Sequence, residues 1–272
     1  EDACGRYIEY AKTTIGNQSL SGLKVVLDCA NGASYVVGPG IFSALGVDVV
    51  ETAVEPDGFN INNECGALHP ETISRLVRRH GADLGIAFDG DADRVVFCDS
   101  DGEVVDGDRI LAMCALDYKR RDRLSHDTLV VTILTNLGLH EAMKANKIRV
   151  VTTTVGDRYV IEKMRSNGYN LGGEKSGHII FMDHATTGDG IISALQVLEA
   201  MVSSGRSLNE VKRGMSKYPQ SLINVPLDKK IDVLALPDVQ CAVADIKARL
   251  AANGRILLRP SGTEPVVRVM VE

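Results

Sequence analysis

Residues 84–94 read Leu-Gly-Ile-Ala-Phe-Asp-Gly-Asp-Ala-Asp-Arg, an apolar run followed directly by aspartates at alternate positions. The first five residues have the length and composition of a buried β-strand. In an extended segment side chains repeat every two residues, so Asp89, Asp91 and Asp93 point the same way. Convergent carboxylates suit a small hard cation such as Mg²⁺, which keeps a position open for a phosphate. The stretch therefore predicts a strand that ends in a metal loop.

Arg94 follows the third aspartate, and its forked guanidinium suits a phosphate oxygen beside the metal. Together these residues favour metal-assisted phosphoryl transfer. A plain acidic turn remains open as an alternative, because Asp-Gly is ordinary turn chemistry. An EF-hand is ruled out, since its loop needs glycine at position six and glutamate at position twelve, where this chain has Arg94 and Ser100.

Composition places the chain among ordinary globular proteins. It has 272 residues, 44% hydrophobic and 24% charged, and its formal charge of −6 argues against a general nucleic-acid binder. No apolar run approaches the ~20 residues that span a bilayer, so no membrane partner is expected. The basic residues at 119–123 suggest a solvated helix end. Six cysteines without a C-x-x-C pair favour a reducing, cytoplasmic location.

Strands and helices alternate twice in the same order, and each series ends in a polar loop, a hairpin and a Gly-Asp helix start. This predicts an α/β fold: two similar three-layer α/β/α domains with mixed, largely parallel sheets, then a smaller α+β C-terminal domain. We expect a helical tail of a missing N-terminal domain (1–16), an α/β domain with the metal loop (17–107), a second α/β domain (108–206) and an incomplete C-terminal domain (207–272).

A second polar loop, Gly173-Glu-Lys-Ser-Gly-His178, precedes a strand in the second series. Its carboxylate, hydroxyl and imidazole are the donors and acceptors that sugar hydroxyls need. Its glycines let the backbone approach a ligand closely. A glycine-rich connection whose side chains face water is the alternative.

A third loop, Arg259-Pro-Ser-Gly-Thr-Glu-Pro265, joins two strands near the end of the chain. The N–H groups around Ser261, Gly262 and Thr263 suit an anion nest, to which Arg259 and Arg268 add charge. The alternative is a simple Pro-Ser-Gly turn of a hairpin.

With these three loops in this order, the chain resembles the α-D-phosphohexomutase superfamily, whose members carry a metal loop, a sugar loop and a phosphate loop on successive domains. The resemblance runs through nearly the whole chain. Within the superfamily it is similar to the bacterial branch that acts on glucosamine phosphates. The supporting stretches are residues 60–66, 81–87 and 186–190, and Lys175 in the sugar loop.

The resemblance implies interconversion of glucosamine 6-phosphate and glucosamine 1-phosphate, a step toward UDP-N-acetylglucosamine and cell-wall precursors. A phosphoserine gives its phosphoryl group to the sugar, and the bisphosphate returns the other one. By resemblance Asp89, Asp91 and Asp93 hold Mg²⁺, and Arg94 and His178 are catalytic. The implied substrate-binding residues are Glu174, Lys175, Ser176, His178, Arg259, Ser261, Gly262, Thr263 and Arg268.

One departure from the family stands out. The nucleophile of the family lies in a Ser-His-Asn motif, and this chain has only Ser125-His126-Asp127. We therefore expect a fragment that binds metal and phosphosugar without turning over alone. The resemblance leaves a homodimer open. Competing interpretations are a non-catalytic Mg²⁺ and phosphosugar module, a mutase for mannose or glucose phosphates, and a phosphatase with an aspartate nucleophile.

Overall fold

The computed structural model describes residues 2–227, 232–251, 254–260 and 265–272. It divides into two compact units. The first comprises Glu1–Thr135 and Leu139–Ser216, and the second comprises Asn136–Gly138 and Lys217–Glu272. Each unit is described by itself below.

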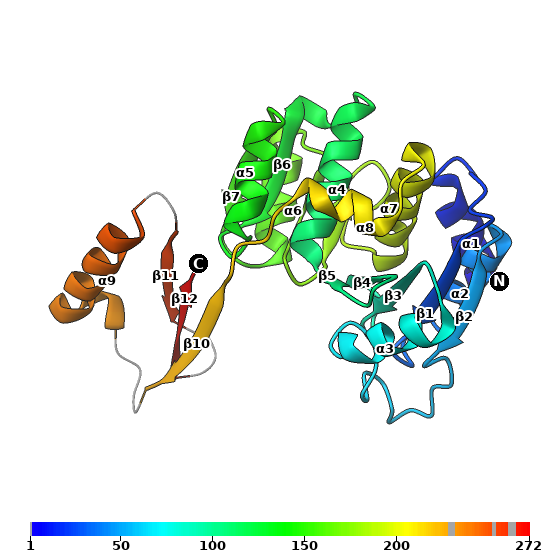
Figure 1. Cartoon of the computed structure of the whole chain (residues 1–272), viewed down its shortest axis with the longest axis horizontal. Coiled ribbons are helices and arrows are strands. Elements are labelled where there is room, and N and C mark those ends of the chain that lie inside the picture. Colours follow the sequence, from blue (N-terminus) through cyan, green and yellow to red (C-terminus); the bar gives the residue numbers. More distant parts are fainter. Residues whose placement is uncertain (1, 228–231, 252–253, 261–264) are drawn as a thin grey trace. The chain divides into compact units, whose positions relative to one another are not determined.

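The first sheet has the strand order β2-β1-β3-β4-β5 (Figure 1). Strand β1 pairs in parallel with β2 and β3, whereas β3, β4 and β5 form an antiparallel meander. The elements are α1 (Ala3–Thr13), β1 (Lys24–Asp28), α2 (Val37–Ala44), β2 (Asp48–Thr52), α3 (Pro70–His80), β3 (Leu84–Phe88), β4 (Val95–Asp99) and β5 (Val104–Val105).

Alternation along β1 and β3 decides which residues face which helices. Val26 and Ala87 pack on one side with Ile73 and Val77 of α3. Their chain neighbours, among them Leu27, belong to the larger core on the other face. A period of two thus buries both faces of the strands, as a sheet between two helical layers requires.

The second sheet repeats this plan with the order β7-β6-β8-β9. Strand β6 pairs in parallel with β7 and β8, and β8 pairs antiparallel with β9. The elements are α4 (Gly107–Arg120), β6 (Thr128–Thr132), α5 (Leu137–Ala145), β7 (Arg149–Thr153), α6 (Asp157–Asn167), β8 (Leu171–Gly173), β9 (Ile179–Phe181), α7 (Gly190–Ser204) and α8 (Leu208–Val211). The predicted repeat of mixed, largely parallel α/β domains is confirmed.

Strand β8 was not predicted, because its three residues include two glycines. Its central Gly172 pairs with Val130 of β6. A Cβ at Gly172 would lie 2.7 Å from the Met164 sulfur and 3.0 Å from Val160, both on α6. The missing side chain therefore lets α6 approach the sheet, an advantage that strand propensity does not register.

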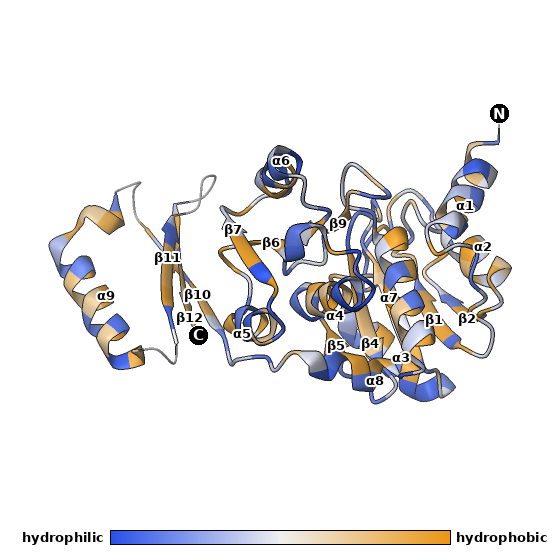
Figure 2. Ribbon diagram, turned by 90° about the horizontal axis from the view of Figure 1, so that it is seen from above, coloured by the Kyte–Doolittle hydropathy of each residue, from blue (hydrophilic) through white to orange (hydrophobic). Residues whose placement is uncertain are grey.

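The second unit is a three-stranded antiparallel sheet with the order β10-β12-β11 and one long helix. Its elements are β10 (Ser221–Pro226), α9 (Pro237–Leu250), β11 (Ile256–Pro260) and β12 (Val266–Val271). Figure 2 shows that the strands carry mostly hydrophobic residues, whereas α6 of the first unit is mostly hydrophilic. The smaller α+β C-terminal domain is confirmed.

Helix α1 packs on α2 and α7 inside the first unit. Its Tyr7 hydroxyl donates to the Asp189 carboxylate, with O···O distances of 2.8 and 3.0 Å. None of the helices in the described ranges is both long and apolar enough to cross a membrane.

Candidate metal centre

The turn between β3 and β4 gathers the predicted carboxylates. One oxygen from each of Asp89, Asp91 and Asp93 lies within 4.8 Å of the others. The turn is tight because the Ala92 N–H donates to the Asp89 carbonyl (3.1 Å) and Ala92 adopts a left-handed φ of 61°. The Arg94 N–H also donates to Asp89 Oδ1 (3.1 Å). A curled loop, not an extended one, brings the acids together.

The electrostatics of this turn favour a cation. Burial, followed by the charge of Asp93, raises the pKa of Asp89 to about 6, although the Arg94 N–H opposes the shift. Asp93 Oδ1 is buried and has no hydrogen-bond partner among the described residues. Arg94 compensates only weakly, since its Nε stands 3.8 Å from Asp89 Oδ2 and 3.7 Å from Asp93 Oδ1. Three crowded oxygen donors are what Mg²⁺ prefers, so the residues fit the ion.

The predicted sugar loop is the turn between β8 and β9, the equivalent place in the second sheet. The Gly177 N–H donates to the Glu174 carbonyl (3.0 Å), and Gly177 has a left-handed φ of 95°. Glu174 Oε1 accepts from the Gly156 N–H at the start of α6 (3.0 Å). This bond fixes one carboxylate oxygen, while Ser176 at the tip of the turn is exposed.

The two turns touch each other directly. The Val95 N–H donates to the Gly177 carbonyl (3.1 Å), and a Cβ at Gly177 would lie 2.3 Å from the Val95 oxygen. His178 Nδ1 lies 3.1 Å from Asp93 Oδ2. Residues predicted separately as a metal loop and a sugar loop therefore form one continuous site within the first unit.

The start of a helix also holds each turn, and both helices are grouped with the second sheet. The Gly190 N–H of α7 donates to the Ala92 carbonyl (2.9 Å), and the Gly107 N–H of α4 donates to the Lys175 carbonyl (3.2 Å). A Cβ on Gly107 would lie 2.3 Å from the backbone carbonyl oxygen of Glu174. The start of α4 can therefore approach the sugar turn only because Gly107 has no side chain. Sequence patterns showed both Gly-Asp helix starts but not their contacts with the turns.

Aspartates cap these two helices. The Asp106 carboxylate accepts from the Arg109 N–H, and the Asp189 carboxylate accepts from the Ile192 N–H. Asp106 and Asp189 each lie just outside their helix, because a side chain at that position reaches the free N–H groups of the first turn. Capping fixes where each helix begins, and so where Gly107 and Gly190 meet the turns.

Behind the metal turn, loops of the first sheet hold its backbone. The Ala33 N–H donates to the Gly90 carbonyl and the Ala67 N–H to the Phe88 carbonyl, both at 2.8 Å. The buried Asp28 carboxylate organises these loops by accepting from the Ala30 and Gly66 N–H groups at 2.9 and 2.8 Å. Asp28 had no place in the predicted site, because a lone aspartate at a strand end gives no distinguishing signal.

The predicted phosphate loop is described only in part. Ser261, Gly262 and Thr263 lie outside the described residues. Arg259 of β11 and Arg268 of β12 are direct cross-strand partners. Arg259 Nε is buried without a hydrogen-bond partner in the described ranges. Like charges opposite each other repel, so this pair favours an anion nearby.

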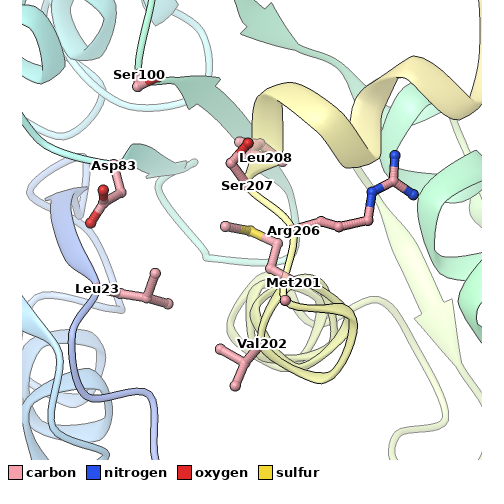
Figure 3. A pocket seen from close by; sticks show the side chains of 9 residues that line it. Leu23, Asp83, Ser100, Met201, Val202, Arg206, Ser207 and Leu208 are labelled. Atoms are coloured by element: carbon pink, nitrogen blue, oxygen red, sulfur yellow. The ribbon is translucent and has the colours of Figure 1, made fainter.

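An apolar cavity of about 280 Å³ lies elsewhere in the first unit. Figure 3 shows Leu23, Met201 and Val202 around it, with the Arg206 guanidinium turned away from Asp83. Its lining includes Met201 and Val202 near the C-terminal end of α7, whereas the metal turn meets Gly190 at the N-terminal end. A 15-residue helix is roughly 22 Å long, so the cavity is remote from the carboxylates.

Comparison with known proteins agrees with this arrangement. Three consecutive domain models of one family match the chain: phosphoglucomutase/phosphomannomutase alpha/beta/alpha domain II at residues 5–102, alpha/beta/alpha domain III at 106–218 and the C-terminal domain at 222–272. The chain belongs to the phosphoglucomutase/phosphomannomutase family.

Individual relatives and solved structures show which members of the family the chain is similar to. The chain is 53% identical to phosphoglucosamine mutases of Geobacter sp. (strain M21) and Geotalea daltonii over its whole length, and it spans about 60% of each. A family protein from Burkholderia thailandensis superposes with a TM-score of 0.78 at 24% identity, covering 100% of this chain and 60% of its own. The Aspergillus fumigatus N-acetylphosphoglucosamine mutase, solved with GlcNAc-6P and magnesium, superposes with a TM-score of 0.77 at 22% identity. The match covers 100% of this chain and 67% of the Aspergillus chain.

Proposed function

We propose that this chain forms the metal- and phosphosugar-binding part of a Mg²⁺-dependent mutase that interconverts glucosamine 6-phosphate and glucosamine 1-phosphate. The observation that carries the proposal is the contact of the two turns. Three carboxylates within 4.8 Å of one another adjoin a glycine-rich turn bearing Glu174, Lys175 and Ser176. Such a site can serve phosphoryl transfer to or from a hexose.

The roles of the residues follow from their placement. Asp89, Asp91 and Asp93 would hold Mg²⁺, which when bound supplies positive charge to the transferring phosphoryl group. Arg94 is half-exposed beside them, so its guanidinium can reach a phosphate oxygen. Glu174 keeps one oxygen on Gly156 and offers the other to sugar hydroxyls.

The C-terminal unit would hold the phosphate that does not react. The Arg259 Nε, buried without a partner among the described residues, and the facing Arg268 support this assignment, and Ser261, Gly262 and Thr263 are proposed as its remaining donors.

We further propose that the 272-residue chain alone does not turn over. Ser-His-Asn, which carries the phosphoserine in the family, does not occur in it. The chain also spans about 60% of the mutases that it matches. The group that donates the phosphoryl would therefore have to come from outside these residues.

Calorimetry on this chain tests the proposal. We expect one Mg²⁺ per chain, binding lost in Asp91→Asn, and binding unchanged in the control Asp48→Asn, whose carboxylate is exposed on β2. With Mg²⁺ present, glucosamine 6-phosphate should bind, and Arg259→Ala should weaken that binding. Failure of wild type to bind Mg²⁺ at millimolar concentration would overturn the proposal.

Product analysis separates the remaining alternatives. Incubation with glucosamine 6-phosphate should yield neither glucosamine 1-phosphate nor free phosphate. Appearance of glucosamine 1-phosphate would refute the proposed dependence on an outside donor, whereas release of phosphate would favour a phosphatase. Tighter binding of mannose or glucose 6-phosphate than of glucosamine 6-phosphate would favour the other mutase specificity.

A further inference from the structure

We propose that Tyr7 is a positioning residue, which fixes the start of helix α7 and through it holds the metal turn in the shape that binds Mg²⁺. This inference rests on the proposed metal site and deepens it, because Tyr7 acts from helix α1, outside the two turns.

Asp189 lies between two glycines that each contact one of the turns. The Gly190 N–H donates to the Ala92 carbonyl of the metal turn (2.9 Å). A Cβ on Gly188 would lie 2.4–2.6 Å from three ring atoms of His178, at the end of the sugar turn. The position of Asp189 therefore decides how the start of α7 meets both turns.

The Asp189 carboxylate is held from two sides. Its Oδ1 accepts from the Ile192 N–H of α7 (2.9 Å), which is the helix cap. The Tyr7 hydroxyl donates to the same carboxylate, at 2.8 Å from Oδ2 and 3.0 Å from Oδ1. Burial, followed by the charge of Asp189, raises the pKa of Tyr7, so its hydroxyl remains a donor at neutral pH. The cap fixes the carboxylate relative to its own helix, whereas Tyr7 fixes it relative to α1.

Helix α1 has further contacts with the same segment. It packs against α7 (Figure 1), and the Tyr10 hydroxyl donates to the His184 carbonyl, a few residues before α7 begins. At the other end of α1, the Gln196 side chain of α7 donates to the Thr14 carbonyl (3.2 Å). Positions 7, 10 and 14 follow the spacing of one helix face. One side of α1 thus supports the segment that carries Asp189.

The alternative is that Tyr7 only adds stability to the packing of α1 on α7. Tyr118 offers a matched comparison, because its hydroxyl donates to Gln196 Oε1 of the same helix (2.9 Å), about two turns beyond Asp189. Tyr118 and Gln196 are each 2% exposed. Tyr118→Phe removes a donor from a buried oxygen, so it should lower the stability at least as much as Tyr7→Phe.

Calorimetry on the full chain compares the Mg²⁺ affinities of wild type, Tyr7→Phe and Tyr118→Phe. Each variant keeps the aromatic ring and loses only the hydroxyl. Loss of a direct partner of a metal ligand typically costs about 10–100-fold in affinity, and Tyr7 acts one step further away, so we expect Tyr7→Phe to bind Mg²⁺ roughly threefold to tenfold more weakly. Tyr118→Phe should stay within ~2-fold of wild type although its urea midpoint falls at least as far. Equal affinity in wild type and Tyr7→Phe, or an equal loss in the two variants, would overturn the inference.

Hydrogen exchange provides a readout that does not depend on the metal. The Gly190 amide should exchange several-fold faster in Tyr7→Phe than in Tyr118→Phe, because its bond to the Ala92 carbonyl opens more often. Equal Gly190 exchange rates in the two variants would also overturn the inference. Wild type that binds no Mg²⁺ would instead refute the proposed metal site, and the Gly190 rates would still decide whether Tyr7 holds the turn.

Discussion

The metal turn and the sugar turn are equivalent places in two repeated domains, and they share a backbone frame. The Asp89 N–H donates to the Arg94 carbonyl as the Glu174 N–H donates to the His178 carbonyl, at 3.4 and 2.9 Å. Each turn bends at a left-handed residue, Ala92 or Gly177. Residues 89–94 span one position more than residues 174–178, and they carry three carboxylates instead of one.

This difference teaches that the chemistry of each turn depends on its side chains and one added residue, while the frame stays the same. Function placed on a common scaffold in this way is general in proteins. The two turns differ in a second respect, their supports. A helix start of the second domain holds each of them, and the hairpin that follows the metal turn has an ionic anchor as well.

The largest expected effect comes from removing that anchor. Lys212 forms ion pairs with Asp99, which is fully buried in β4, and with Glu103. Lys212→Met leaves the Asp99 carboxylate without its counter-ion, so we expect a loss of roughly 3–5 kcal/mol in the free energy of unfolding. Urea titration measures it. Lys119→Met, which breaks the exposed pair with Asp127, should cost less than ~1 kcal/mol. If Lys212→Met and Lys119→Met lowered the free energy of unfolding equally, the stabilising role given to Lys212 would be contradicted.

The glycines at the two helix starts test how each start supports its turn. A Cβ on Gly190 would lie 2.8 Å from the backbone carbonyl oxygen of Arg94. A Cβ on Gly107 would lie 2.3 Å from the backbone carbonyl oxygen of Glu174. We expect Gly→Ala at either position to cost roughly 1–3 kcal/mol of stability, more at Gly107. Gly190→Ala should weaken Mg²⁺ binding, and Gly107→Ala should weaken phosphosugar binding.

Gly40→Ala is the control for both glycines, because only a flexible Ile8 side chain lies near, at 3.2 Å. Helix propensity alone should make that variant neutral or slightly more stable. If Gly190→Ala and Gly107→Ala each weakened Mg²⁺ binding and phosphosugar binding equally, the assignment of one helix start to each turn would be contradicted.

The pH dependence of Mg²⁺ binding distinguishes the acidic turn from its partner. Because the pKa of Asp89 is raised to about 6 in the folded metal-free protein, Asp89 takes up a proton on folding between about pH 4 and 6. Its contribution to stability therefore falls as pH rises through this window. Mg²⁺ must displace the proton below pH 6, so we expect roughly tenfold weaker binding at pH 5 than at pH 7.5.

Thermal shifts with Mg²⁺ at the two pH values measure this effect, with Asp89→Asn as the comparison. That variant should lose both the pH dependence and much of the affinity. A Mg²⁺ shift that is the same at pH 5 and pH 7.5 would contradict the role given to burial at Asp89.

The smallest expected effect concerns Glu174. Glutamine keeps an oxygen that accepts from the Gly156 N–H, so Glu174→Gln should change stability by less than ~1 kcal/mol. It removes the charge that strengthens a hydrogen bond to a sugar hydroxyl, so glucosamine 6-phosphate should bind several-fold more weakly. Mg²⁺ affinity should stay the same. Loss of Mg²⁺ binding in Glu174→Gln would show that the sugar turn also takes part in holding the metal ion.

Much of this fold could be predicted from periodicity. The strand at Leu84–Phe88 has the predicted bounds, because it is an apolar run that ends at a turn. Asp89, Asp91 and Asp93 do lie together, but through a curled turn and not through the extended segment on which the prediction rested. Strand β8 was missed, since Gly172 owes its place to pairing with Val130 and to packing against α6.

The contacts that join the turns were beyond prediction. Gly188 against the His178 ring, and Gly107 against the sugar turn, are approaches between residues far apart in sequence or placed by a cap. A glycine shows that something comes close but not what it is. The contact between the Gly188 N–H and His178 Nε2 likewise forms only in the folded chain.

The contact between the α7 start, in the second domain, and the metal turn of the first domain has a consequence for inheritance. A helix start that fits the turn of its neighbour ties the history of one domain to that of the other. Recombination that replaced a single domain with that of a distant homologue would join surfaces that had not evolved together. The pair, and not the single domain, is therefore the piece that can be shuffled intact.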